Sequence, residues 1–174
     1  MICVVVGVFA LSLAVGFGQD DRKAQFFGRW KMDPARSDSA HQAVPIGAMT
    51  VVIKQTANEL IIETMTSVSR NGSAAQTESV AYRLDGLENT VTTPSGGTLK
   101  TRARWDGPKL VTETVRNING VPVTMQHVLS VRAGGKQLTI DRTLTVQHGY
   151  QSPSGNNTGA GKDVFVRTSN SSRK

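Results

Sequence analysis

Two ionisable side chains lie on strand faces that are otherwise apolar. Between residues 121 and 132, every second residue from Val121 is apolar except His127. Between residues 137 and 146, every second residue from Leu138 is apolar except Arg142. A buried guanidinium is costly unless it is paired and hydrogen-bonded, so both positions need a chemical explanation.

Two explanations are open. In the first, Arg142 reaches a barrel mouth or pairs with an internal acid, and His127 is a core histidine with satisfied hydrogen bonds. In the second, both anchor an acidic ligand in an otherwise apolar cavity, as polar groups in small-molecule pockets commonly do. The second hypothesis predicts a small apolar or amphiphilic ligand, no cofactor, and a binding set of inward-facing residues: Arg142, His127, Tyr82, Met125 and Trp105.

The other reactive side chains form no catalytic constellation. The carboxylates of Glu63, Glu113 and Asp141 fall on outward strand faces, so we expect no hydrolytic pair. The three histidines are far apart without metal-type spacing, although His127 and His148 could meet in space. No glycine-rich phosphate loop leads into a helix, and no serine lies in a nucleophile elbow. We therefore expect a protein that is not an enzyme and holds no metal.

Alternating hydrophobicity and turn signals dominate from residue 28 onward and predict about ten short strands. The expected strands are residues 28–32, 49–55, 60–68, 79–84, 90–93, 98–106, 109–117, 121–132, 137–146 and 162–168. Turn pairs Asp85-Gly86, Asp106-Gly107, Asn119-Gly120 and Gly134-Gly135 lie between strand candidates and supply the positive φ angles of tight hairpins. The predicted fold is an all-β, antiparallel up-and-down β-barrel of about eight to ten strands.

The remaining segments are predicted to be irregular or short. Residues 19–27 form a lead-in in which residues 20–27 could make one helical turn. Residues 34–47 and 147–161 read as polar loops, and residues 169–174 as a disordered tail. The barrel domain is expected to span residues 28–168.

The N-terminal segment predicts export. Residues 2–17 carry no charge and are followed by an abruptly polar stretch from Gln19, which is typical of a signal peptide over residues 1–18. Cleavage after Gly16 and a membrane anchor are the alternatives. Cys3 is the single cysteine, so the mature chain would have no disulfide. The expected location is the periplasm or the exterior.

The charge balance suggests a second function class. The chain has 20 basic and 13 acidic residues, a formal net charge of +7. Such a surface favours anionic partners, and Lys100, Arg102 and Arg104 should share one outward face. The alternative function is therefore an interaction module for an anionic surface or polymer without an internal ligand. The bases are scattered and aromatics are few, so we expect no nucleic-acid binding, and we expect a monomer.

Gly28-Arg29-Trp30, on the first predicted strand, resembles the Gly-X-Trp motif of lipocalins and their calycin relatives. The order of elements over residues 28–168 is similar to that of bacterial exported lipocalin-like proteins of unknown function. The resemblance implies that Trp30 closes one barrel end and packs against a late arginine, whose position Arg167 takes. In this motif Gly28, Trp30 and Arg167 have a structural role. The chain departs from the family in lacking a clear second lipocalin motif.

Overall fold

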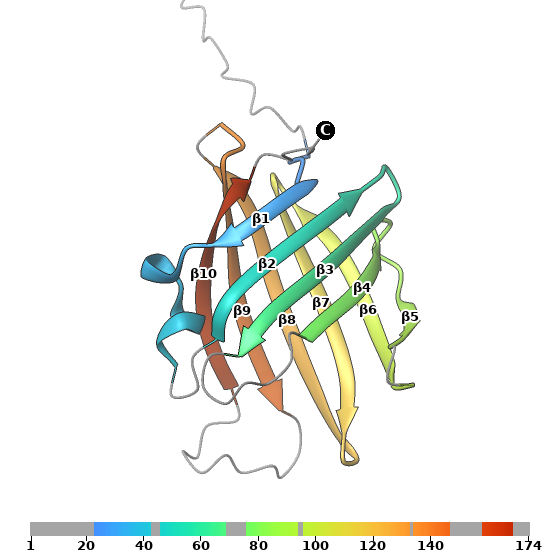
Figure 1. Cartoon of the computed structure of the whole chain (residues 1–174). Coiled ribbons are helices and arrows are strands. Elements are labelled where there is room, and N and C mark those ends of the chain that lie inside the picture. The colour runs from blue at the N-terminus through green and yellow to red at the C-terminus, as the bar shows by residue number, and fades with distance from the viewer. Residues whose placement is uncertain are drawn as a thin grey trace, which may run out of the picture.

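The strands of the structure follow the predicted ones closely. A computed structural model of the chain describes residues 23–42, 46–68, 76–93, 96–132, 134–146 and 158–168. Within these residues the strands are β1 (Gly28–Met32), β2 (Ile46–Gln55), β3 (Glu59–Val68), β4 (Gln76–Arg83), β5 (Asn89–Thr92), β6 (Thr98–Asp106), β7 (Lys109–Ile118), β8 (Val121–Arg132), β9 (Gln137–Val146) and β10 (Thr158–Thr168) (Figure 1). The bounds of β1, β6, β8 and β9 are those expected from the sequence.

These strands form one antiparallel sheet in the order β4-β3-β2-β1-β10-β9-β8-β7-β6-β5. The sheet curls until β1–β4 lie in front of β6–β10 (Figure 1). Across the break between the two edge strands, the Thr101 hydroxyl donates a hydrogen bond of 2.8 Å to the backbone oxygen of Ala81. The predicted all-β, up-and-down barrel is therefore confirmed, with a nearly closed wall.

Hairpin turns connect most of the strands, as predicted. At the turn between β7 and β8, Asn119 has φ 52° and Gly120 has φ 84°. Two successive positive φ angles are the requirement of a type I′ hairpin, and Asn-Gly meets it without steric cost. The side chain of Asn117 also accepts the backbone N–H of Gly120 at 2.6 Å, which fixes the turn.

One end of the barrel, here called the closed end, is sealed by Trp30 and Arg167. The guanidinium carbon of Arg167 lies 4.2 Å from the centre of the Trp30 ring, and Trp30 is fully buried. Arg167 also donates hydrogen bonds of 2.7 Å to the backbone oxygens of Gly135 and Phe27. The Trp30 ring N–H donates to the Phe26 carbonyl at 2.9 Å. The predicted contact between the first and last strands is thus confirmed.

Gly28 is required at this junction for two reasons. Its φ of +130° lies where side chains are strained. A Cβ atom at Gly28 would also lie 2.7 Å from a guanidinium nitrogen of Arg167. The glycine therefore lets the arginine lie flat against the first strand, which gives the Gly-X-Trp motif a physical basis.

The helical turn predicted over residues 20–27 is wrong for the described residues 23–27, which form neither a helix nor a strand. The side chain of Gln55 supplies the hydrogen bonds that a helical turn would have made. It accepts the N–H of Phe26 at 2.7 Å and donates to the carbonyl of Ala24 at 3.3 Å. Phe26 is thereby held fully buried inside the closed end. Within residues 23–27, Phe26 thus fills the closed end of the barrel without forming a helix.

The loop predicted over residues 34–47 is also partly wrong, because it contains two short 3₁₀ helices, η1 (Pro34–Arg36) and η2 (Asp38–His41). Between them, the Ser37 hydroxyl accepts the N–H of Val164 at 3.0 Å and donates to its carbonyl at 3.2 Å. β1 pairs only with the end of β10, so these helices supply partners to the part of the β10 edge that β1 leaves unpaired.

β10 begins at Thr158, four residues before the predicted start. Its glycines had suggested a loop, but Gly159 and Gly161 pair with β9 opposite Leu144 and Arg142. The predicted signal peptide (1–18), the tail (169–174) and His148 lie outside the described residues. Neither described helix has the length and apolar character needed to cross a membrane.

Candidate ligand-binding site

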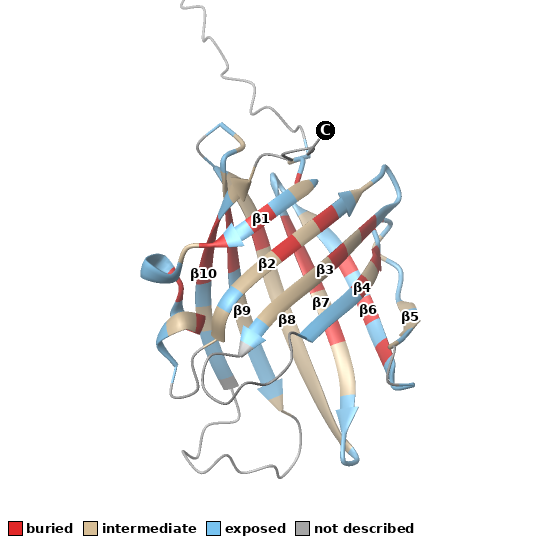
Figure 2. Cartoon of the chain, in the orientation of Figure 1, coloured by how far each residue is buried: buried red, intermediate tan, exposed pale blue. Residues whose placement is uncertain are grey.

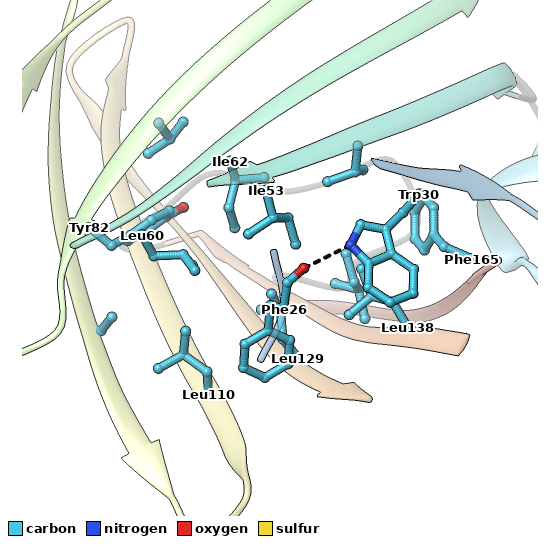
Figure 3. Packing of buried hydrophobic residues seen from close by; sticks show 14 of the residues in the cluster. Phe26, Trp30, Ile53, Leu60, Ile62, Tyr82, Leu110, Leu129, Leu138 and Phe165 are labelled. Carbon is cyan, nitrogen blue, oxygen red and sulfur yellow. Dashed lines mark hydrogen bonds between the residues drawn. The ribbon is translucent and has the colours of Figure 1, made fainter. Parts of the chain in front are cut away.

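The interior of the barrel changes character along its length. Toward the closed end it is a packed apolar core, which Figure 3 shows in close-up. Its fully buried members are Phe26, Trp30, Ile53, Leu60, Leu110, Leu129, Leu138 and Phe165. Toward the opposite end, where β3 ends and β4 begins, the strands become half-buried or exposed (Figure 2). The second half is therefore the less tightly packed part of the barrel.

The second half holds a cavity of about 660 Å³, here called the mouth. It is lined by the ends of β3, β4, β6 and β7, including Thr64, Glu78, Leu99 and Arg116. Arg116 donates a hydrogen bond of 2.6 Å to the Glu78 carboxylate, which joins β7 to β4 across the unpaired edge of the sheet. The mouth is thus polar but internally charge-balanced.

Three polar side chains outside the lining of the mouth form a row across the inner wall. Thr112 of β7 lies directly opposite His127 of β8, and His127 lies directly opposite Arg142 of β9. Residues directly opposite in an antiparallel pair share one face, with Cβ atoms about 5 Å apart. Each member has one buried polar atom without a hydrogen-bond partner among the described residues: Thr112 Oγ1, His127 Nε2 and Arg142 Nη2.

His127 is uncharged at neutral pH. Burial lowers the pKa of His127 to about 4, and the nearby positive charge of Arg142 acts in the same direction. The carboxylates of Asp163 and Glu78 oppose this shift without cancelling it. The imidazole can therefore donate one hydrogen bond and accept another, but it contributes no charge to the row.

Arg142 pairs with an internal acid, as the first sequence explanation proposed. Its Nε donates to Asp163 Oδ2 at 2.8 Å. The Asp163 side chain is only 2% exposed and also accepts hydrogen bonds from the Ser39 N–H at 3.0 Å and the Ser39 hydroxyl at 2.7 Å. Three donors compensate the buried carboxylate, which makes the ion pair tolerable in the interior.

Gly161 gives Arg142 its position. A Cβ atom at Gly161 would lie 2.7 Å from Arg142 Nη2, closer than side chains approach each other. The guanidinium therefore lies over the bare backbone of β10, where its Nε reaches Asp163 two residues along the strand.

Tyr82 adds a hydroxyl to the same region from β4. Its oxygen lies 2.9 Å from Thr114 Oγ1, one inward position along β7 from Thr112. Burial raises the pKa of the Tyr82 phenol, although the hydrogen bond to Thr114 works against the shift. Tyr82 is therefore a neutral hydrogen-bonding group at physiological pH.

Four of the five predicted ligand residues share this region. Arg142 and His127 belong to the row, and Tyr82 reaches the neighbouring Thr114 from β4. Met125 lies directly opposite Thr114 and Leu144, one inward position closer to the end of β9. Trp105 is elsewhere: its ring stacks on Phe26 at the closed end, with ring centres 6.0 Å apart. The sequence placed Trp105 on the inward face but could not show which end of the barrel it occupies.

Several residues of the site were missed from the sequence. Asp163 lies two positions before Phe165 in the same strand, so the alternating pattern predicts that it faces inward. The pattern does not show that Asp163 pairs with Arg142. Glu78 was missed because β4 begins three residues before its predicted start. Ser39 lies in the 3₁₀ helix η2, and no periodic pattern in the sequence indicates so short a helix.

The described residues include no group of three or more His, Cys, Asp or Glu side chains that could hold a metal ion. Glu63 forms an ion pair of 2.6 Å with Lys54 on the outer surface. Asp141, also predicted to face outward, is exposed. What the interior offers is hydrogen bonding and shape, which suit binding.

No protein-family model matches the sequence, and no curated protein is similar to it in sequence. Solved structures do match the barrel. Lipid binding protein 8 from Caenorhabditis elegans superposes with a TM-score of 0.51 and 11% identity, over 82% of this chain and 95% of that one. Human cRBP IV gives a TM-score of 0.51 and 16% identity, over 83% and 99% of the two chains. These matches show a shared fold, a lipocalin-like all-β barrel.

A third match is the N57A mutant of the fluorescent protein UnaG, with a TM-score of 0.50 and 16% identity over 83% of this chain and 96% of that one. At these identities the comparisons show the shared fold.

Proposed function

We propose that this calycin barrel binds one small amphiphilic molecule in the half of its interior that opens at the mouth. The observation that carries the proposal is the row formed by Thr112, His127 and Arg142. Each of the three presents a buried polar atom that no described residue partners. Leaving a buried polar group unpaired costs about 1–3 kcal/mol, so a polar head group that paired with them would bind favourably.

The surroundings of the row fit the apolar part of such a molecule. Met125 and Leu144 lie opposite each other on the inner wall, and Leu144 is 37% exposed although it faces inward. An apolar ligand covering Leu144 and Met125 would remove their surface from water. The fold itself supports the proposal, since one solved structure that shares it is a lipid binding protein.

A displacement assay with matched variants tests the proposal. The delipidated protein should bind the neutral apolar dye Nile red with saturation, and dodecan-1-ol should displace it. Leu144→Trp, which fills the inner wall, should weaken dye binding by about tenfold or more, because it removes the space for the ligand. Thr143→Trp adds the same ring to the outer face of β9 and should leave binding unchanged. Equal effects of the two variants, or no saturable binding, would refute an internal site.

A second candidate function rests on the outer wall. A groove of about 390 Å³ is lined by four basic side chains, Arg36, Lys109, Arg132 and Lys162, together with Asp141. The groove is partly neutralised, because Arg36 pairs with Asp33 at 2.8 Å and Lys162 lies opposite Asp141. The predicted patch on β6 is partly neutralised in the same way: Lys100 pairs with Glu88 at 3.1 Å, and Arg102 lies opposite Glu113. Arg104 is exposed on the same face.

Binding of an anionic surface by this groove would be electrostatic and should weaken steeply with salt. Sedimentation with vesicles containing anionic phospholipid, compared with zwitterionic vesicles at low and high salt, tests it. Equal binding to both kinds of vesicle would exclude the groove as an anion-binding surface.

We further propose that the protein acts outside the cytoplasm and as a binding protein rather than an enzyme. The uncharged residues 2–17 support export, and the outward position of the predicted carboxylates supports the absence of hydrolytic chemistry. N-terminal sequencing of protein recovered from the periplasm and medium tests the first part. A chain recovered only from the cytoplasm with residues 1–18 intact would contradict it.

A further inference from the structure

The charges inside the barrel cancel in pairs. The charged side chains that face inward from the described strands of the open half are Arg142, Asp163, Arg116 and Glu78. Arg142 pairs with Asp163 at 2.8 Å outside the lining of the mouth. Arg116 pairs with Glu78 at 2.6 Å in the mouth itself. Two positive and two negative charges leave the inner wall with no net charge.

The other polar groups of the site are neutral. His127 and Tyr82 are uncharged at physiological pH for the reasons given above. Thr112 and Thr114 contribute hydroxyl groups, which donate or accept hydrogen bonds as the partner requires. The open half of the interior is therefore rich in hydrogen-bonding groups and free of surplus charge.

We infer that the site selects an amphiphile whose head group is uncharged and hydroxyl-like over one that carries a carboxylate. This inference rests on the proposed function and specifies the class of its ligand. An acidic ligand was one of two explanations that the sequence left open, because the sequence shows Arg142 without its partner. With Asp163 in place, the positive charge of Arg142 is already compensated.

The physical reason is the cost of burying a charge. A carboxylate beside the row would add a negative charge near Asp163 without a net positive charge to balance it, and a desolvated unbalanced ion is strongly disfavoured. An alcohol oxygen can accept a hydrogen bond from Arg142 Nη2 and exchange hydrogen bonds with His127 Nε2 or Thr112 Oγ1. It thereby satisfies the row without a charge penalty.

The test compares two probes of equal chain length, dodecan-1-ol and dodecanoate, by displacement of Nile red at pH 8. The wild-type protein should bind the alcohol more tightly by about tenfold or more. Asp163→Asn leaves the Arg142 charge uncompensated and should reverse this preference. Glu113→Gln removes one negative charge from the outer face of β7 and should leave the preference of the wild type unchanged.

A second measurement does not depend on a variant that folds. Lowering the pH from 8 to 5 brings dodecanoate close to its carboxyl pKa of about 4–5 and produces the neutral acid. Its affinity for the wild-type protein should then rise by about tenfold or more, while that of the alcohol stays constant.

Tighter binding of the carboxylate at pH 8, or a dodecanoate affinity that does not change with pH, would overturn the inference and leave an internal site intact. Equal effects of Asp163→Asn and Glu113→Gln on the preference between the alcohol and the carboxylate would also overturn the inference. If neither probe displaces the dye from the wild-type protein, the proposed function fails together with the inference.

Discussion

His127 should make the barrel lose stability in mildly acidic solution. In the folded protein, burial and the charge of Arg142 lower the pKa of His127 to about 4. In the unfolded chain the ring returns to its ordinary pKa of about 6.5. As the pH falls below 6.5, His127 becomes protonated in the unfolded state but stays neutral in the folded state until about pH 4. Stability is therefore full above pH 6.5 and decreases between pH 6.5 and pH 4.

The size of the effect follows from the two pKa values. Each pKa unit corresponds to about 1.4 kcal/mol, so the whole window is worth about 3 kcal/mol. Between pH 7 and pH 5 the free energy of unfolding should fall by about 2 kcal/mol through His127 alone. Since a domain of this size is stable by roughly 5–15 kcal/mol, the loss is measurable.

Urea unfolding at pH 7 and pH 5 measures the difference. His127→Gln keeps a neutral polar side chain and should lose about 2 kcal/mol less between the two values than the wild type. His41→Gln is the control, because His41 is exposed and should leave the pH dependence unchanged. If His127→Gln and the wild type lose the same free energy, the histidine is not buried as neutral imidazole and the argument fails.

Three further substitutions test the packing that closes the barrel and orders the site. Trp30→Ala should reduce the free energy of unfolding by about 3–5 kcal/mol, measured by urea denaturation, because it empties the closed end. Arg167→Lys should lower the melting temperature, since an ammonium group cannot stack on the Trp30 ring or bond both carbonyls; an unchanged melting temperature would show that the planar group is dispensable. Gly161→Ala should destabilise the protein by displacing Arg142, whereas Gly159→Ala, whose Cβ meets nothing within 4 Å, should have a smaller effect; equal changes would contradict the proposed close approach.

The sequence predicted the barrel well because alternation and turn chemistry act locally. The face of a residue such as Leu138 is predicted from the residues two positions away. Asn119-Gly120 predicts a hairpin without information from the rest of the chain. The contact of Trp30 with Arg167 is long-range and came from the resemblance to calycins. Its physical basis in the glycine at position 28 became visible only in the structure.

The candidate site was harder to predict because its key partners lie far apart in the sequence. Asp163 and Ser39 are 124 residues apart and meet only when η2 lies against β10. Alternation placed Arg142 inside but could not supply the register that brings it to Asp163. Trp105 shows the same limit. Alternation along a strand predicts which face a residue occupies, but it does not predict the position of that residue along the barrel axis.

The placement of β1 and β10 also determines which end of the barrel faces a surface when the protein is attached through either end of the chain. β1 begins and β10 ends at the closed end, where Arg29 lies opposite Thr168, and Phe26 plugs the interior just before β1. Chain segments on either side of the barrel are therefore attached at the end remote from the mouth. A resin, a fused reporter or a lipid surface that tethers the protein by either terminus would leave the mouth pointing outward into solution, free to exchange its contents.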